Sequence, residues 1–120
     1  MHRLPRDFDT SVFNGIALEL VSFTENSIHF QFDRRISITL ESSYAYHFDS
    51  SAGGVEKNDV PVTESRLMSL VGHIVQTAEI DDDGTTLRLR FGGGRILECF
   101  DKTPQYESFR IAIGDREVLV

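Results

Sequence analysis

The densest group of potential metal ligands in the sequence is the run Asp81-Asp82-Asp83-Gly84, with Glu79 just before it. Alternating carboxylates followed by a glycine are typical of a calcium loop, which also needs a bidentate glutamate at its twelfth position. With Glu79 as the first position, the twelfth is Arg90, a cation where the last ligand is required. We therefore predict a solvated turn without a metal. Any binding role of the three aspartates would be to dock a basic partner, because they carry repelling charges at the surface.

The single cysteine and the four histidines are the other residues capable of catalysis. Cys99 would need a nearby base to form a thiolate. It lies on the apolar face of an alternating segment, which predicts a core residue. The histidines show none of the close spacings typical of metal ligands. Gly92-Gly93-Gly94 opens no helix, so it predicts a turn between strands and not a phosphate loop. The sequence therefore predicts a protein that is not an enzyme, with no catalytic residue, metal or cofactor.

Three arginines, Arg88, Arg90 and Arg95, are expected on the outer face of one hairpin. Glu79 and Glu98 can pair with them across neighbouring strands, and we prefer this arrangement. An anion site made by the arginines is the alternative.

Aromatic side chains supply two candidate binding regions. Tyr106-Glu107-Ser108-Phe109 places a carboxylate between two aromatic rings, which predicts either a recognition surface or a cover over one end of the fold. Together with Asp81, Asp82 and Asp83, the residues Tyr106, Glu107 and Phe109 form the candidate binding set. The alternative is a ligand pocket lined by Tyr44, Tyr46 and His47.

Strands must position these residues, because apolar residues alternate with polar ones along much of the chain. Residues 28–40 and 87–99 each contain two such segments separated by a short turn. A shift of 59 positions superimposes their apolar residues, and a shift of 57 superimposes the preceding segments. The two-residue difference falls in a turn, where length changes cost little. The chain therefore contains two similar three-strand meanders.

Neither meander can bury its apolar face alone, so the two must pack together. We predict a mainly β fold in which duplicated three-strand meanders form a sandwich or partly open barrel. The two halves are expected to be related by a pseudo-twofold axis.

The boundaries follow from composition. A single domain is predicted, because the chain has 120 residues. Residues 1–12 are predicted as an N-terminal arm, 13–48 as the first β repeat and 49–63 as a loop. A short helix is expected near residues 64–71, with Thr63 as its N-cap and Leu67, Leu70 and Val71 as its apolar stripe. The second β repeat and the C-terminal strands fill 72–120.

The charge balance restricts the partners. Lys and Arg number 12 against 19 Asp and Glu, which gives a net charge of -7. This balance argues against nucleic acid or an anionic membrane as a partner, since both require a concentrated basic face. One cysteine, no secretory signal and no apolar run long enough to span a bilayer favour the cytoplasm.

The second half of the chain resembles an uncharacterised family of small bacterial all-β proteins, a domain family of unknown function. The family pattern has an L-x-L-x-F-x-x-G-x-x-L hairpin followed by Y-E-x-W. The matching residues are Leu70, Gly72, Val75, Asp83, Gly84, Leu87, Leu89, Phe91, Gly94, Leu97, Tyr106, Glu107 and Phe109. Phe109 occupies the position where the family pattern has tryptophan, so a role that depends on the indole is not expected here. The family is similar in style to immunity proteins of bacterial toxin systems, and it implies no catalytic residues.

From these observations we expect a non-enzymatic protein-binding module that resembles an immunity protein and binds another protein, such as a basic toxin. The alternatives are a small-ligand-binding β-barrel and a homodimeric structural module joined through an edge strand.

Overall fold

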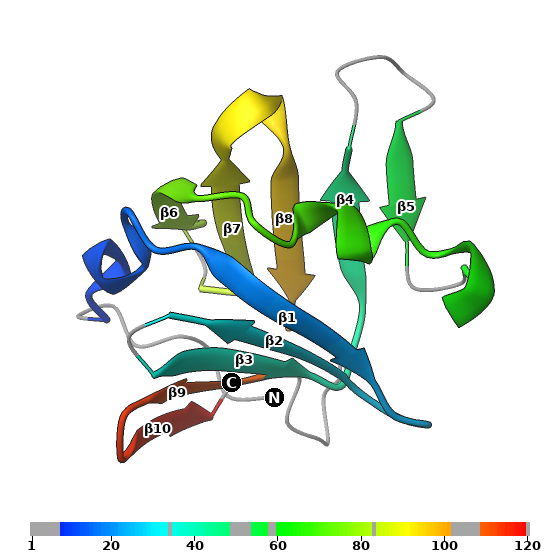
Figure 1. The fold of residues 1–120 in the computed structure, drawn as a ribbon. Coiled ribbons are helices and arrows are strands. Elements are labelled where there is room, and N and C mark those ends of the chain that lie inside the picture. Colours follow the sequence, from blue (N-terminus) through cyan, green and yellow to red (C-terminus); the bar gives the residue numbers. More distant parts are fainter. Residues whose placement is uncertain are drawn as a thin grey trace.

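The computed structural model describes residues 8–33, 35–48, 54–57, 60–82, 84–101 and 109–119. These residues form strands joined by short 3-10 turns (Figure 1). The strands are β1 (Leu18–Phe23), β2 (Ile28–Phe32), β3 (Ile36–Leu40), β4 (Tyr44–His47), β5 (Val55–Lys57), β6 (Val75–Ile80), β7 (Thr86–Phe91), β8 (Ile96–Phe100), β9 (Phe109–Ile113) and β10 (Arg116–Leu119). The turns are η1 (Thr10–Phe13), η2 (Val62–Glu64), η3 (Leu67–Leu70) and η4 (Gly92–Gly94). No helix in the described ranges has the length and apolar character that a membrane span requires.

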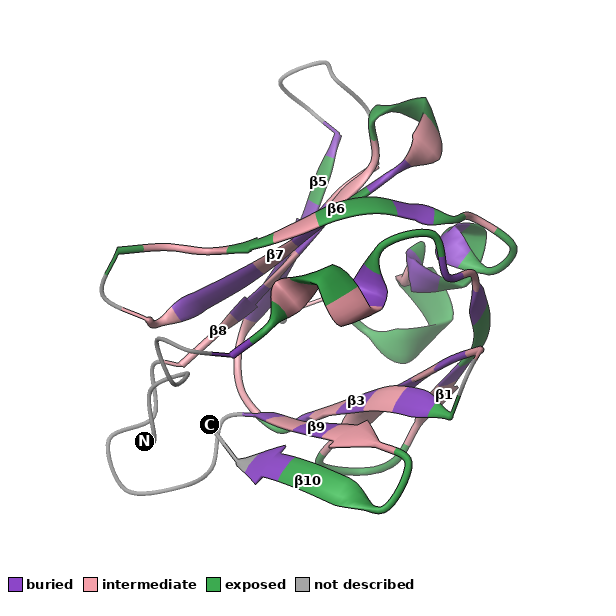
Figure 2. Ribbon diagram, turned by 90° about the vertical axis from the view of Figure 1, so that its left-hand side faces the viewer, coloured by how far each residue is buried: buried purple, intermediate pink, exposed green. Residues whose placement is uncertain are grey.

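The strands form two antiparallel sheets of five strands each. The first has the order β1-β2-β3-β9-β10 and the second the order β5-β4-β8-β7-β6. The sheets face each other with their buried residues between them (Figure 2). The predicted mainly β fold is confirmed, and the described strands form a sandwich and not a closed barrel.

The predicted meanders are β1-β2-β3 and β6-β7-β8, one in each sheet. Each meander is followed in the chain by a hairpin that joins the opposite sheet. The β4–β5 hairpin follows the first meander but pairs with β8, and the β9–β10 hairpin follows the second meander but pairs with β3. This exchange of hairpins ties the two halves of the chain together through backbone hydrogen bonds.

The apolar residues of both meanders fill the space between the sheets. Phe30, Ile38, Leu89 and Leu97 are each fully buried. Burial of a side chain of this size contributes roughly 1.5–3 kcal/mol. Packing of the two inner faces is therefore the main source of stability, and it leaves the rim of the sandwich as the place for a pocket.

The segment predicted as a helix near residues 64–71 contains two separate 3-10 turns, η2 and η3. Thr63 is not the N-cap, since η2 begins after Pro61 and has no side-chain cap. The buried Leu67 and Leu70 are three residues apart, a spacing that suits one 3-10 turn as well as an α-helix. Ser65 separates η2 from η3 with an extended conformation, and the extended Val71 ends η3, so no longer helix forms.

Two predicted boundaries also differ from the structure. Phe8 is buried, and the carboxylate of Asp9 caps η1, so the described end of the predicted arm (residues 1–12) packs on the sandwich. The predicted loop, residues 49–63, contains strand β5, which pairs with β4. The expected loop thus contributes an edge strand to the second sheet.

Candidate anion-binding site

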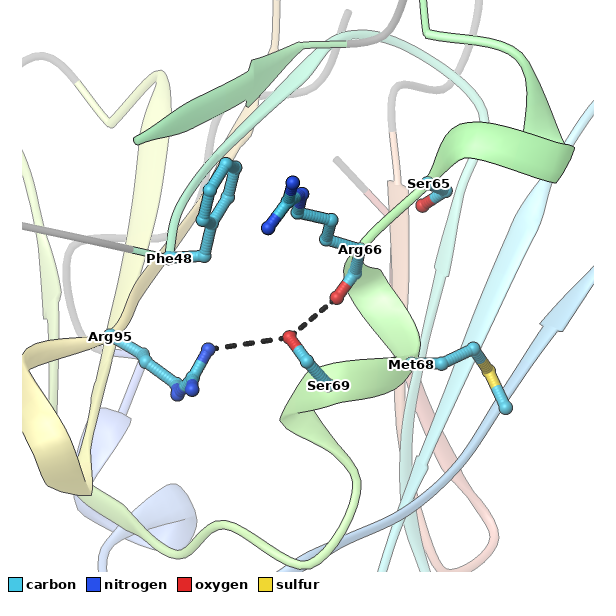
Figure 3. Close-up of a pocket in the computed structure, with 6 residues that line it drawn as sticks. All are labelled: Phe48, Ser65, Arg66, Met68, Ser69 and Arg95. Carbon is cyan, nitrogen blue, oxygen red and sulfur yellow. Dashed lines mark hydrogen bonds between the residues drawn. The ribbon is translucent and has the colours of Figure 1, made fainter. Parts of the chain in front are cut away.

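A pocket of about 450 Å³ opens at the rim of the sandwich, beside β4, η3 and the turn between β7 and β8 (Figure 3). Its described lining residues are Phe48, Ser65, Arg66, Met68, Ser69 and Arg95. They come from three separate regions of the sequence, so the pocket exists only because the fold brings these regions together.

Local backbone geometry explains how Arg95 reaches the pocket. It directly follows η4, in which Gly93 and Gly94 have φ values of +80° and +78°. Glycine adopts this left-handed conformation without the steric penalty of other residues. The two glycines reverse the chain between β7 and β8, and Arg95 leaves the turn toward Tyr46 and Ser69.

A buried carboxylate positions the other arginine. Glu56 is 3% exposed and accepts hydrogen bonds from Tyr44 Oη and Ser65 Oγ, both at 2.7 Å, and from the backbone N–H of Arg66. These contacts attach the chain before η3 to strand β5. Glu56 therefore fixes the backbone from which the Arg66 side chain extends.

Hydrogen bonds join Arg95 to η3 both directly, by a 3.3 Å bond from Nη1 to Ser69 Oγ (Figure 3), and through Tyr46. Arg95 Nη1 donates to Tyr46 Oη at 2.8 Å, and Ser69 Oγ donates to the backbone oxygen of Arg66 at 2.6 Å. Tyr46 Oη and Ser69 Oγ are 2.7 Å apart. Since a hydroxyl has only one hydrogen to donate, Tyr46 must donate to Ser69. Arg95 keeps its Nε and Nη2 donors outside this network.

An aromatic ring holds the Arg66 guanidinium. The central carbon of the guanidinium lies 4.6 Å from the centroid of the Phe48 ring. The Phe48 ring in turn contacts the Tyr46 ring, with their centroids 5.7 Å apart. A guanidinium over an aromatic face is attracted to it, and its charge is retained. Glu56 thus holds the Arg66 backbone, whereas the Arg66 guanidinium itself is oriented by Phe48.

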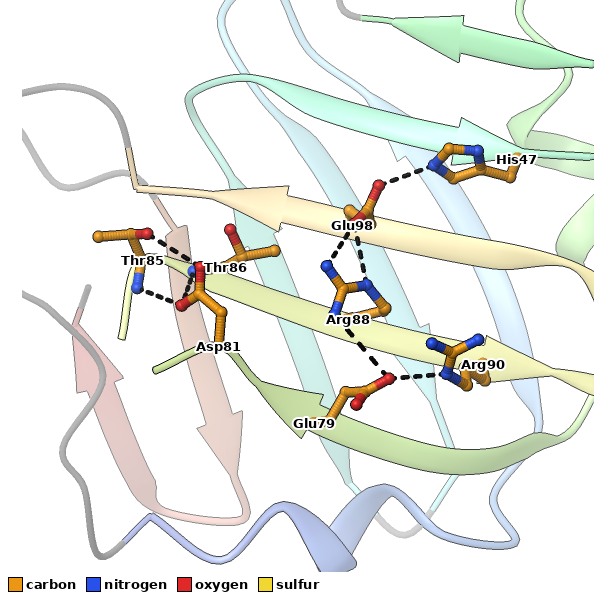
Figure 4. A network of polar contacts seen from close by, with 8 residues as sticks. All are labelled: His47, Glu79, Asp81, Thr85, Thr86, Arg88, Arg90 and Glu98. Carbon is orange, nitrogen blue, oxygen red and sulfur yellow. Dashed lines mark hydrogen bonds and ion pairs between the residues drawn. The ribbon is translucent and has the colours of Figure 1, made fainter. Parts of the chain in front are cut away.

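Other arginines of the described chain do have carboxylate partners. On the outer face of the second sheet, Arg88 lies 2.8 Å from Glu98, and Arg90 lies 2.7 Å from Glu79 (Figure 4). The predicted cross-strand pairing is therefore correct for Arg88 and Arg90. It is wrong for Arg95, which faces the pocket. Within the described ranges, neither Arg66 nor Arg95 has a carboxylate at ion-pair distance.

The outer-face network also contains His47, whose Nε2 is 2.7 Å from Glu98 Oε1. Burial by itself raises the pKa of Glu98, but hydrogen bonds from His47 and Arg88 outweigh it, and the net pKa is lowered. Because side chains alternate along a strand, His47 lies on the opposite face of β4 from Tyr44 and Tyr46. The predicted ligand-lining set is therefore divided between two pockets. Tyr46 contacts residues of the arginine pocket, whereas Tyr44 and His47 both line a second pocket of about 330 Å³.

The described members of the predicted protein-binding set, Asp81, Asp82 and Phe109, differ in their surroundings. Asp81 accepts hydrogen bonds from the backbone N–H groups of Thr85 and Thr86 at 2.9 and 3.1 Å, so its carboxylate stabilises the turn (Figure 4). Asp82 is exposed, whereas Phe109 is completely buried and pairs with Leu40. Phe109 is therefore a core residue and offers no exposed aromatic surface. Asp83, Tyr106 and Glu107 lie outside the described residues.

The predicted core role of Cys99 agrees with its complete burial. Burial, with a smaller contribution from the Glu98 charge, raises the pKa of the thiol to about 12. A thiol with this pKa forms almost no thiolate at neutral pH and is a poor nucleophile. No group of three or more potential metal ligands occurs among the described residues.

No individual motif in the sequence revealed the pocket. Phe48, Arg66 and Ser69 lie outside every candidate set taken from the sequence, because none belongs to a local pattern that indicates binding. The sequence did point to Arg95, because an anion site was the alternative interpretation of the cluster Arg88, Arg90 and Arg95.

Comparison with known proteins places the chain in a family but gives it no function. No curated protein and no solved structure matches it. The chain does match a family profile over residues 10–120, which is nearly its whole length. It therefore belongs to DUF6188, a family of unknown function.

Proposed function

We propose that this protein is a non-enzymatic binding module that takes an anionic group into the pocket between Arg66 and Arg95. One observation carries the proposal: both guanidinium groups are oriented by neutral partners, Phe48 for Arg66 and Tyr46 with Ser69 for Arg95. Their charges are therefore available to a ligand, on a chain whose net charge is -7.

The chemistry of the pocket supports this proposal. A guanidinium presents several N–H donors in a planar fork that matches the oxygens of a carboxylate or phosphate. The arginines are held before any ligand arrives, which lowers the entropic cost of binding. The volume of about 450 Å³ lies within the range of roughly 300–1,000 Å³ that is typical of small-molecule sites.

Binding without catalysis is supported by the side chains that line the pocket. Its described lining residues include no histidine, cysteine, aspartate or glutamate, the residues most often used for proton transfer. Ser69 donates to the backbone oxygen of Arg66 and receives hydrogen bonds from Tyr46 and Arg95, so none of these partners is a side chain that could accept its proton. It is therefore not activated as a nucleophile.

The proposal is tested by calorimetric titration with inorganic phosphate and with succinate, at constant ionic strength. Arg66→Ala and Arg95→Ala should each weaken phosphate binding by about ten-fold, equivalent to ~1.4 kcal/mol. The matched control is Arg116→Ala, which removes one positive charge from an exposed position on β10. Absence of binding for both anions, or equal losses in all three variants, would contradict the proposal.

A second candidate function, binding to another protein, is favoured by exposed apolar side chains. Leu20 and Ile74 are 49% and 52% exposed. They lie on segments joined by a hydrogen bond from the Leu18 N–H to the His73 oxygen. This surface would serve the immunity-like role expected from the family resemblance, with a bacterial toxin as the partner.

Co-expression with the products of neighbouring genes tests this second function. A stable complex should form and should be lost in the Leu20→Ser/Ile74→Ser double variant, while Val62→Ser, another exposed apolar position, should leave it intact. If no neighbouring product binds, or if the double variant still binds, this function is wrong. A homodimer in light scattering that the same double variant dissociates would instead assign the surface to self-association.

A further inference from the structure

We propose that the ligand of the Arg66–Arg95 pocket is a phosphate monoester carried on a flat aromatic body, such as a nucleoside monophosphate. This inference rests on the proposed anion-binding function and narrows it to one ligand class. The phosphate would lie between the two guanidinium groups, and the aromatic body would stack on Arg66.

The charge of the pocket favours a phosphate over a single carboxylate. Arg66 and Arg95 together contribute two positive charges, and the described lining residues contribute no negative one. A phosphate monoester carries about -1.5 to -2 charges at neutral pH and has three strong acceptor oxygens. It can therefore accept from Arg95 and Arg66 at once, whereas one carboxylate has half the charge and fewer oxygens.

The contact between Arg66 and Phe48 favours an aromatic body. A guanidinium is planar, and aromatic rings stack on its faces. Phe48 lies against one side of the Arg66 guanidinium, at 4.6 Å, and Arg66 as a whole is exposed. A flat ligand ring on the other side would extend the series of contacts that begins at Tyr46 and Phe48.

The size and lining of the pocket agree with a ligand larger than a free anion. Phe48 and Met68 contribute apolar surface beside the polar groups of Ser65 and Ser69. The volume of about 450 Å³ leaves room for a body attached to the phosphate.

The experiment compares the calorimetric affinities of adenosine 5′-monophosphate, ribose 5-phosphate, adenosine and inorganic phosphate. Adenosine 5′-monophosphate should bind about ten-fold more tightly than ribose 5-phosphate, because stacking of one base contributes about 1–3 kcal/mol. Arg66→Lys keeps the charge but removes the planar group. It should weaken the binding of ribose 5-phosphate, which loses the guanidinium fork. It should weaken adenosine 5′-monophosphate about ten-fold more, because that ester also loses the stacking, so the ten-fold preference should disappear.

The outcomes separate this inference from the proposed function. If the two phosphate esters bind equally and more tightly than adenosine, the aromatic body is wrong and the anion site stands. If succinate binds but neither ester does, the ligand is a carboxylate and the inference is wrong. If adenosine binds as tightly as its monophosphate, the phosphate contributes nothing and the inference is wrong. If no anion binds, both proposals fail. If Arg66→Lys still prefers adenosine 5′-monophosphate over ribose 5-phosphate by about ten-fold, the aromatic body does not stack on Arg66.

Discussion

Ala17 and Ile74 form an isolated antiparallel bridge with each other, although they lie 57 positions apart and occupy equivalent places in the two halves of the chain. A residue that pairs with its own counterpart must lie beside the axis that relates the two copies. The bridge between Ala17 and Ile74 is therefore where a twofold axis relating the two predicted repeats would pass.

The backbone around this bridge follows the same relation. The Gly15 N–H donates to the Val75 oxygen at 2.8 Å, and the equivalent Gly72 N–H donates to the Leu18 oxygen at 2.8 Å. Irregular pairing occurs at equivalent places too, after Leu18 in β1 and after Val75 in β6. The two meanders thus have the same local structure as well as the same apolar pattern.

Gly15 and Gly72 provide a first prediction. Their φ values are +80° and +91°, and a Cβ atom at either position would meet nothing within 4 Å. Gly15→Ala and Gly72→Ala should therefore each lower the free energy of unfolding through backbone strain alone, by roughly 1–3 kcal/mol and by similar amounts. Urea denaturation measures both losses.

The control for this prediction is Gly92→Ala. Gly92 has no left-handed φ, and its added Cβ would lie 3.8 Å from the Gln76 side chain, an ordinary contact. We expect it to be neutral or slightly stabilising. A loss at only one of the two equivalent glycines would contradict equal strain at the two sites.

Glu56 provides a second prediction. Glu56→Ala would leave Tyr44 Oη, Ser65 Oγ and the Arg66 N–H without their acceptor in a buried place. The free energy of unfolding should fall by about 1–3 kcal/mol. Tyr44→Phe removes a single donor and serves as the matched comparison, with an expected loss of about 0.5–1.5 kcal/mol. A Glu56→Ala variant as stable as the wild type would show that the segment before η3 is held by other contacts.

A third prediction concerns pH and Glu98. The folded state lowers the pKa of Glu98 because hydrogen bonds from His47 and Arg88 outweigh its burial. A depressed folded pKa contributes stability above the ordinary pKa of about 4.5, and this contribution disappears as the pH falls through the folded value. The difference in unfolding free energy between wild type and Glu98→Gln should therefore decrease toward acid pH.

Denaturation over a pH series measures this difference. In an Arg88→Gln background one of the lowering hydrogen bonds is absent, so the pH dependence contributed by Glu98 should be smaller. A difference between wild type and Glu98→Gln that increases toward acid pH would contradict the assigned direction.

Cys99 provides a fourth prediction. Since the thiol is buried and its pKa is raised to about 12, a maleimide should label the native protein at mildly alkaline pH only as fast as the protein unfolds. Adding urea should accelerate labelling in parallel with the loss of β-sheet circular dichroism. Rapid labelling of the native protein would show that the inner face near Cys99 opens locally.

The fold was largely predictable because its main determinant is local. Apolar and polar residues alternate along 28–40 and 87–99 because successive side chains of a strand point to opposite faces. The same pattern in both segments strengthened the prediction of strands. The exchange of the β4–β5 and β9–β10 hairpins was not predictable, because it depends on which distant edges pair. The turn η1 was not predicted. Phe13 is its buried residue and is equivalent to Leu70 of η3, and a single apolar residue gives no helical pattern.

The site was less predictable than the fold, for a physical reason. Its geometry depends on Glu56, a charged residue of the segment predicted as a loop, whose carboxylate is buried and bonded to the segment before η3. It also depends on the positive φ values of Gly93 and Gly94, which direct Arg95 away from Glu98 and toward Tyr46. The glycine run predicts the turn but not the direction in which Arg95 leaves it, and no sequence pattern signals the burial of Glu56.

The hydroxyl of Tyr46 provides the last prediction, which links stability to binding. Tyr46→Phe keeps the ring that contacts Phe48 but removes the oxygen that accepts from Arg95 Nη1 at 2.8 Å and donates to Ser69. The unfolding free energy should fall by about 0.5–1.5 kcal/mol. Arg95 would also lose the shorter of its two hydrogen bonds and keep only the 3.3 Å bond to Ser69, so phosphate should bind several-fold more weakly.

Tyr44→Phe is the matched control for this variant, because Tyr44 lies on the same face of β4 and its hydroxyl contacts Glu56 but not Arg95. It should cause a similar loss of stability with a smaller loss of phosphate affinity. Equal affinities in the two variants would mean that Tyr46 stabilises the rim of the sandwich without orienting Arg95. The pocket would then depend on Arg66 and Phe48 for its pre-formed geometry.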